Sequence, residues 1–229
     1  IPRTTLRAGY DVSLRTKLYL IHSVRAAYGY QFREDIRKEH QLFPVNINYV
    51  RTDTLAPPTE SSINYSNIIF NGLIIGPTYQ YTYNSQAAGL RKDNFFFDGL
   101  ADLSNNVLGL IQGASQESPR QIFGTNYAQY IKLQADGRYY LNYAPSHKNN
   151  IWANRIIVGY GYPWGNSRQL PNIKQFFSGG ASSLRGFPSR MVGPGTFNDE
   201  YLNGDAPRQR FVEMLGDIKL EINTEFRAH

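Results

Sequence analysis

The chain has 229 residues, a net charge of +6, no cysteine, and an aromatic content dominated by 17 Tyr and 13 Phe. The lack of cysteine excludes disulfide scaffolds and thiolate metal sites within this sequence. No stretch approaches the ~20 consecutive apolar residues of a membrane-spanning helix, which excludes a helical membrane protein. The basic residues are scattered singly, without a Lys/Arg run, so they favour the lining of a polar lumen over a nucleic-acid surface.

Eight segments alternate apolar and polar residues with a period of two, which is typical of strands with one apolar and one polar face. In chain order they are 3–15, 18–33, 43–49, 67–83, 94–111, 127–143, 151–162 and 216–227. In the last segment Ile, Leu, Ile, Thr and Phe fall on one face, and Lys, Glu, Asn, Glu and Arg on the other. Pro77 interrupts the fourth segment and predicts a bulge or an unpaired edge, because proline donates no ladder hydrogen bond.

The lengths of these segments and of their connections favour a membrane barrel. Several segments exceed the ~5–6 residues usual for soluble strands and reach the ~9–11 that cross a bilayer at a tilt. Long connections (51–66, 113–126, 163–215) follow odd segments, and shorter ones (34–39, 84–93, 144–150) follow even segments, although the first connection, near Thr16, is short. Outer-membrane barrels place long loops on one side in this way. The sequence therefore predicts an all-β, antiparallel transmembrane β-barrel.

The last connection is far longer than a hairpin needs, and loops above ~15 residues in a compact fold are usually functional. Its glycines at 179, 180 and 186 permit positive φ and a tight fold. They flank Arg185, which we expect to be carried inside the barrel toward a carboxylate on the polar face of the last segment. The candidates are Glu221 and Glu225. The alternative is a solvated surface loop whose arginine meets neither acid.

The segment GGASSLRGF at 179–187 resembles the (V/L)RGF loop signature of the BamA/TamA superfamily of outer-membrane β-barrel assembly factors. Within it, Gly179, Gly180, Leu184, Arg185, Gly186 and Phe187 carry the motif. Gly-Asn-Ser at 165–167, Phe-Phe-Ser-Gly-Gly at 176–180, Gly-Pro-Gly at 193–195 and Asn-Thr-Glu-Phe-Arg at 223–227 are similar to TamA-like members. The resemblance implies that Glu225 is the carboxylate that pairs with the loop arginine.

The resemblance also implies an architecture. Residues 1–229 would be part of one outer-membrane barrel domain, namely strands five to twelve of sixteen, with the long loop folded into the lumen. The periplasmic POTRA modules and the first and last barrel strands would lie outside this sequence. Closure on eight strands is the alternative, but an eight-strand interior is just wide enough for side chains and leaves no room for the loop.

The sequence carries no recognisable catalytic or cofactor motif. The four histidines are isolated, which argues against a metal site, and there is no Gly-x-Ser-x-Gly elbow or Gly-Lys-Ser/Thr phosphate loop. Asp98 and Asp102 share a strand face and are better explained as lumen lining than as paired acids. We therefore expect a non-enzymatic protein without cofactors.

The resemblance implies a bacterial outer-membrane protein that assembles, inserts or translocates other proteins through strand pairing at the barrel seam. Its partners would be the outer-membrane bilayer, client outer-membrane proteins, and periplasmic or lipoprotein accessory subunits, with no nucleic acid. Three alternatives stay open: a passive porin-like channel, a dedicated export pore for one secreted partner protein, and a barrel that anchors a surface enzyme.

Overall fold

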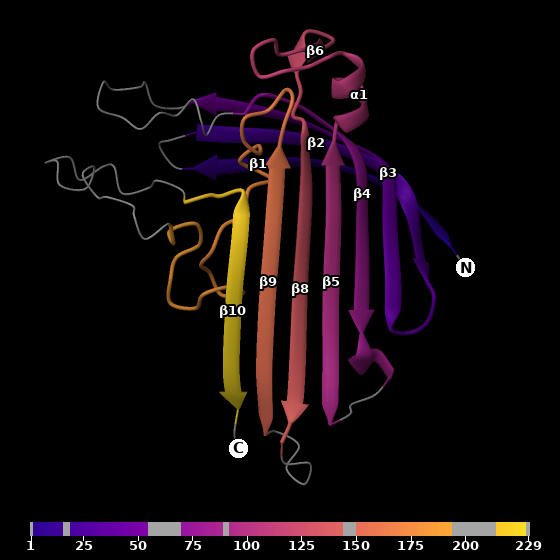
Figure 1. Ribbon diagram of the computed structural model, residues 1–229, viewed down its shortest axis with the longest axis vertical. Coiled ribbons are helices and arrows are strands. Elements are labelled where there is room, and N and C mark those ends of the chain that lie inside the picture. The colour runs from indigo at the N-terminus through magenta and orange to yellow at the C-terminus, as the bar shows by residue number, and fades with distance from the viewer. Residues whose placement is uncertain are drawn as a thin grey trace, which may run out of the picture.

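The computed structural model describes residues 2–15, 19–54, 70–88, 92–143, 150–193 and 214–227. One antiparallel sheet of eight strands dominates it, in the order β1-β2-β3-β4-β5-β8-β9-β10 (Figure 1). Its strands are β1 (Arg3–Arg15), β2 (Tyr19–Arg33), β3 (Lys38–Thr54), β4 (Gly72–Asn84), β5 (Asp93–Ser104), β8 (Tyr130–Asn142), β9 (Ile151–Pro163) and β10 (Ile218–Arg227). The smaller elements are the 3-10 helix η2 (Ser85–Ala88), the helix α1 (Asn106–Ile111), and the hairpin β6 (Gln121–Ile122) and β7 (Thr125–Asn126).

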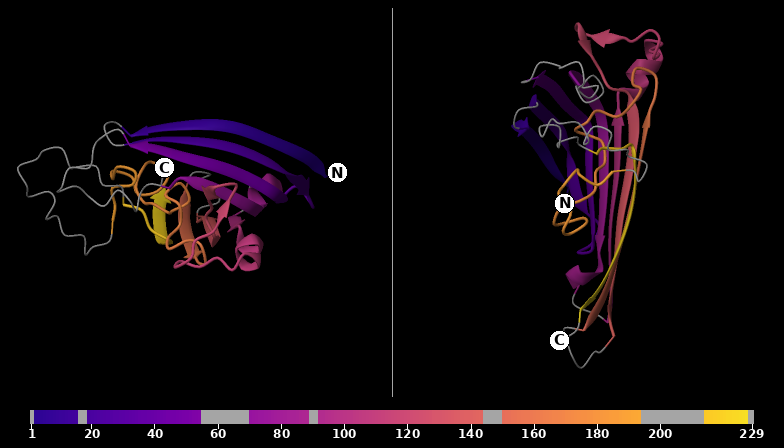
Figure 2. Two further views of the ribbon diagram at one scale, coloured as in Figure 1. Left: turned by 90° about the horizontal axis from the view of Figure 1, so that it is seen from above. Right: turned by 90° about the vertical axis from the view of Figure 1, so that its left-hand side faces the viewer.

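The sheet is strongly curved, so that β1–β3 face β8–β10 across its concave side (Figure 2). The segment that follows β9 lies on this concave side. Within the described residues, β1 and β10 form the two edges and each pairs with a single neighbour. The fold is therefore the predicted all-β antiparallel sheet, with the curvature of part of a β-barrel. None of the helices described has the length and apolar character needed to cross a membrane.

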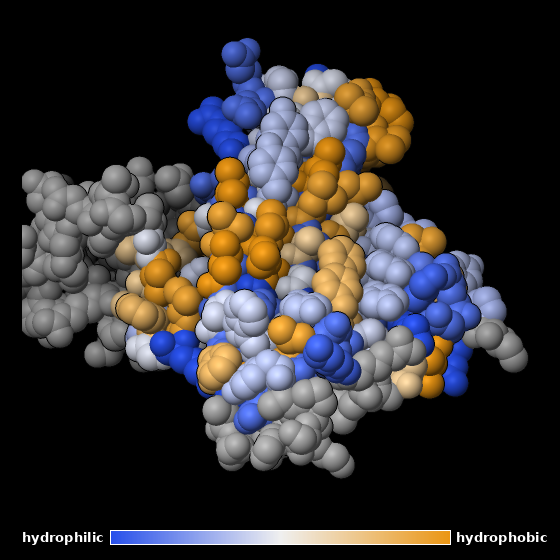
Figure 3. Space-filling model, turned by 60° about the horizontal axis from the view of Figure 1, so that its bottom comes forward, coloured by the Kyte–Doolittle hydropathy of each residue, from blue (hydrophilic) through white to orange (hydrophobic). Residues whose placement is uncertain are grey.

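The two faces of the sheet differ in chemistry as the alternation predicts. On β10, Leu220 is 69% exposed on the convex face, whereas the adjacent Glu221 is 5% exposed on the concave face. On β1, Leu6 and Val12 likewise lie exposed on the convex face. Figure 3 shows hydrophobic residues gathered over the strands of this outer face, with hydrophilic residues on either side of them. An exposed apolar surface of this extent marks an interaction surface, and in a barrel it is the surface that meets lipid.

The bulge predicted at Pro77 is confirmed. The β3–β4 register passes from the pair Phe43 and Thr78 to the pair Asn46 and Gly76, so that two β3 residues oppose the single proline. Pairing between β4 and β5 starts at Thr78, just after the proline. On the other side of the proline, the Leu73 carbonyl instead accepts a hydrogen bond from Ala128 N at 2.9 Å. Pro77 therefore marks the point where β4 changes partner.

The fifth predicted strand, 94–111, is wrong at its C-terminal end. The strand stops at Ser104, because Asn105 adopts the left-handed conformation (φ 49°), and residues 106–111 form α1. The side chain of Asn105 donates to the Ala128 carbonyl at 3.0 Å, which fixes this break. Val107 fits the period-two pattern of the predicted strand, but with the apolar residues three and four positions later it also follows a helical period, and the structure adopts the helix.

Three further boundaries differ from the prediction. The loop expected over 113–126 contains the β6–β7 hairpin. Residues 127–129, predicted as the start of the sixth strand, lie beside β4 instead, and Tyr127 is buried. The third strand, β3 (Lys38–Thr54), is longer than the predicted 43–49 and includes the end of the connection expected at 34–39. The connection near Thr16, most of the loop at 51–66, and the connection at 144–149 lie outside the described residues, as do 194–213.

Candidate functional site

The described part of the long connection after β9, residues 164–193, lies against the inner face of β8–β10 and is here called the inner loop. Its apolar side chains Leu170 and Phe176 are 1% and 6% exposed. Both pack on glycines of β9: a Cβ on Gly161 would lie 2.6 Å from Leu170, and one on Gly159 would lie 2.6 Å from Phe176. Because these glycines are two residues apart, they share the inner face of the strand. The wall therefore has a recess into which the inner loop fits.

A buried charge pair holds the same part of the inner loop to β5. The Lys174 ammonium lies 2.6 Å from the Asp102 carboxylate, and their side chains are only 20% and 5% exposed. From β8, Lys132 donates a hydrogen bond to the Lys174 carbonyl at 2.7 Å and places its ammonium 4.3 Å from the centroid of the Phe176 ring. Tyr130 also donates to the Asp102 carboxylate, at 3.3 Å. The base of the inner loop is thus tied to two strands by charged groups largely shielded from water.

Residues 179–190 of the inner loop form a compact hairpin, here called the RGF hairpin. Gly180 N donates to the Phe187 carbonyl at 2.8 Å, which closes it. Gly179, Gly180 and Gly186 have φ values of 96°, 92° and 87°, a region that side chains rarely adopt. At Gly179 a Cβ would also lie 2.2 Å from the Pro188 carbonyl oxygen. The glycines of the sequence motif are therefore needed for the shape of the hairpin.

The RGF hairpin touches the inner wall through side chains of β9 and β10. Ser183 Oγ donates to the Glu221 carboxylate at 2.6 Å, and Arg155 Nη1 donates to the Ser182 carbonyl at 2.5 Å. The Arg155 guanidinium is itself held by Asp136 of β8, with Nη2 2.6 Å from Oδ2. The hairpin is thus hydrogen-bonded directly to β9 and β10, and the Arg155 that it contacts is held in turn by β8.

The predicted arginine and acids lie in this region, with partners that the sequence did not indicate. Arg185 is exposed, and among the described residues it has no carboxylate within 4.0 Å; its charge acts on Glu225 from a longer distance. Glu225 is bonded to Arg227 at 2.9 Å. Glu221 contacts Lys219 at 2.9 Å and accepts the hydrogen bond from Ser183. The pairing of Arg185 with either acid stays a prediction.

The remaining motif residues, Leu184 and Phe187, are half-buried and exposed, respectively. Sequence reasoning missed Ser183, Arg155 and Lys174. The pattern Gly159-x-Gly161 indicates the docking surface in the sequence. It places two glycines on the polar face of one strand, and the missing side chains leave room for another segment to pack there.

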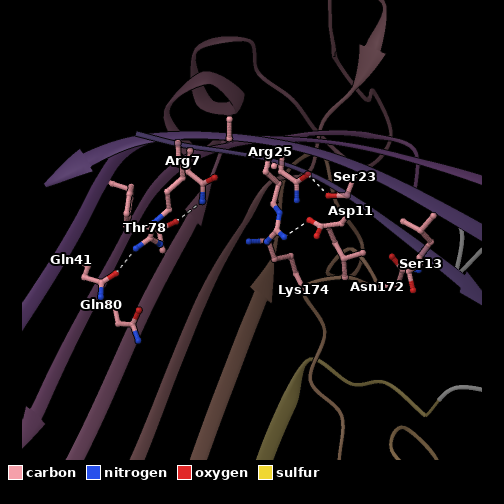
Figure 4. Close-up of a pocket in the computed structure, with 18 of the residues that line it drawn as sticks. Arg7, Asp11, Ser13, Ser23, Arg25, Gln41, Thr78, Gln80, Asn172 and Lys174 are labelled. Carbon is pink, nitrogen blue, oxygen red and sulfur yellow. Dashed lines mark hydrogen bonds and ion pairs between the residues drawn. The ribbon is translucent and has the colours of Figure 1, made fainter. Parts of the chain in front are cut away.

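A cavity of about 790 Å³ separates the inner loop from the inner faces of β1–β4. Its wall is polar: Arg25 of β2 pairs with Asp11 of β1, and Arg7 donates to Gln41 at 3.0 Å (Figure 4). Asn172 enters it from the inner loop. Among the described residues there is no group of three or more His, Asp or Glu side chains that could hold a metal ion.

A curved antiparallel sheet with an apolar outer face, a polar inner face and a loop packed inside defines an outer-membrane type of β-barrel. The sequence model of the Omp85 superfamily domain matches residues 3–228. The chain belongs to the Omp85 superfamily, which includes the BamA/TamA proteins. Members of this family are outer-membrane β-barrels that act without catalysis in assembling or translocating outer-membrane proteins.

Proposed function

We propose that this chain forms the wall and the lumen loop of a BamA/TamA-type factor, similar to TamA, that inserts client outer-membrane proteins. In this proposal the barrel works without catalysis: a client strand adds to the barrel seam by edge pairing, in which main-chain hydrogen bonds supply affinity. The strands of the seam and the periplasmic POTRA modules lie outside residues 1–229. Reading the full gene for these elements tests that part of the proposal.

The docking of the inner loop on β8–β10 is the observation that carries this proposal. A seam that opens for clients needs a rigid wall elsewhere in the barrel. Buried contacts at Phe176 and at the Lys174–Asp102 pair join three strands to one loop and so oppose their separation. In a passive channel the same loop would instead act as the constriction of an open pore.

We further propose that Arg185 pairs with Glu225 when the barrel is complete and working. The short distance between the RGF hairpin and β10 at Ser183 and Glu221 supports this, because it brings the Arg185 charge near enough to act weakly on Glu225. The pair would hold the hairpin on the wall while a client enters.

The test uses the full-length protein in lipid vesicles. Arg185→Ala should slow the insertion of an unfolded outer-membrane client and make the RGF hairpin easier to cleave by trypsin after Arg190, which is followed by Met191. Arg168→Ala is the matched control, because Arg168 is an exposed arginine of the same loop outside the hairpin. Wild-type client insertion and wild-type protease resistance in Arg185→Ala would refute the role of the arginine.

Measurements on the same vesicles distinguish the proposed assembly role from the alternative functions. A porin-like channel would give steady conductance without increasing client insertion. A dedicated export pore would move one secreted partner and leave general clients in solution. If neither client insertion nor protein transport occurs, the proposed assembly role is wrong.

A further inference from the structure

The helix α1 presents an apolar face that no part of the described chain covers. Val107, Leu110 and Ile111 are 72%, 66% and 78% exposed. Their spacing of three and four residues puts them on one side of the helix. No residue from Asn106 to Gln112 is charged. The helix is therefore short, neutral and strongly apolar on one side.

The opposite side of α1 is fixed to the sheet. Gly109 is buried, and a Cβ there would lie 2.2 Å from the Gln129 side chain. At the start of the helix, Asn106 donates to the Tyr130 carbonyl at 3.0 Å and accepts a hydrogen bond from Trp164 Nε1 at 2.7 Å. These contacts hold the helix in one orientation, so its apolar face is directed away from the strands.

The height of α1 on the barrel follows from the strand register. Leu103, just before the helix, pairs with Ile131, which in turn pairs with Tyr162 of β9. Tyr160 and Tyr162 lie half-exposed on the outer face, next to Trp164, which contacts α1. Aromatic residues in this position form the girdle at the membrane–water interface of a barrel. The helix therefore begins at the level of that interface.

We propose that α1 rests in the outer edge of the lipid bilayer, with Val107, Leu110 and Ile111 inserted among the lipids. A helix with one apolar face lies in the interface with this face about 5–10 Å deep. The strand β8, which pairs with β5 just before the helix, also exposes an apolar side chain, Leu133, on its lipid-facing side. A stable protein interface needs roughly 800 Å² on each partner, which three side chains do not supply. Lipid is therefore the occupant that fits.

The test places a fluorescent probe at single positions of the full-length protein in phosphatidylcholine vesicles. Residues 1–229 contain no cysteine, so Leu110→Cys or Val107→Cys gives a unique labelling site after any cysteine elsewhere is replaced. The matched control is Glu117→Cys, an exposed position of the same connection outside the helix. Spin-labelled lipids should quench the probe at 107 and 110 several-fold more than at 117. Aqueous iodide should give the opposite order.

Two results would overturn the proposal. If iodide quenches the probe at 110 as strongly as at 117, the face lies in water. If the probe at 110 is protected from both quenchers, a protein or another part of the chain covers the face instead of lipid. Heat-modifiable migration on gels establishes that each labelled barrel is folded, and the two helix positions provide independent readings.

Discussion

A largely buried ion pair joins the inner loop to β5, between Lys174 and Asp102, whose side chains are 20% and 5% exposed. Lys174→Met keeps the length of the side chain but leaves the buried carboxylate without its main partner. Loss of one member of a buried pair typically costs about 3–5 kcal/mol. We expect the variant to lose this order of stability and to expose the inner loop to protease, which equilibrium unfolding in urea and limited proteolysis measure.

A double substitution controls for a general effect of Lys174→Met. Replacing both residues, in Lys174→Met with Asp102→Asn, removes the uncompensated charge and should recover part of the lost stability. If the two effects simply add, the groups do not interact, and the pair is not what holds the loop.

The recess at Gly159 gives a second prediction for a single residue of the inner wall. Gly159→Ala would put a methyl group 2.6 Å from the Phe176 ring, and overpacking of this kind typically costs about 1–3 kcal/mol. We expect Phe176 to be displaced and the inner loop to be cleaved faster by trypsin. Gly137→Ala in β8 is the matched control, because a Cβ there meets open space. Equal cleavage rates in the two variants would show that the recess does not seat the loop.

The RGF hairpin is the element whose shape depends most on glycine. Gly179 and Gly186 both have positive φ, but only Gly179 is also crowded, with the Pro188 carbonyl oxygen 2.2 Å from the position of a Cβ. Gly179→Ala should therefore open the hairpin, whereas Gly186→Ala should add backbone strain alone. Trypsin cleavage after Arg185 in the two variants measures the difference. Faster cleavage in Gly186→Ala than in Gly179→Ala would contradict the hairpin geometry.

Strands of this fold could be predicted because each has one face toward lipid and one toward a polar interior, which imposes the period-two pattern directly on the sequence. β10 follows this rule except at Thr224, a polar residue on the lipid-facing side whose hydroxyl donates to Asn154. The rule fails at Val107, where an apolar residue belongs to a short helix and the local pattern does not distinguish the two structures over a few residues. Asn105, a residue that tolerates the left-handed conformation, was the signal for the break.

The candidate site was predictable only in part. The glycines of the RGF hairpin and its position next to Glu221 follow from the motif and from the alternation in β10. The contacts of Lys174 with Asp102 and of Arg155 with Ser182 join residues 72 and 27 positions apart. No local pattern encodes such pairs, since they depend on how the whole sheet curves.

At the scale of the whole molecule, the fold separates two surfaces. The convex face, with Leu220 among its exposed apolar residues, suits lipid, and the concave face, with Glu221 and Asp136, holds charged groups that bind the inner loop. Both surfaces arise from the same strands, because neighbouring residues point to opposite sides. The proposed role in client assembly rests on the inner loop staying on the concave face in the membrane.

A cysteine crosslinking experiment on the full-length protein in membranes tests that placement most directly. Ser183→Cys paired with Glu221→Cys should be joined by a short bifunctional reagent, because Ser183 contacts Glu221 across 2.6 Å. Ser183→Cys paired with Leu220→Cys should not, since Leu220 is the adjacent residue but faces outward. Efficient crosslinking of the first pair alone is the predicted result. Equal yields for the two pairs, or no crosslink at position 221, would contradict the docked hairpin.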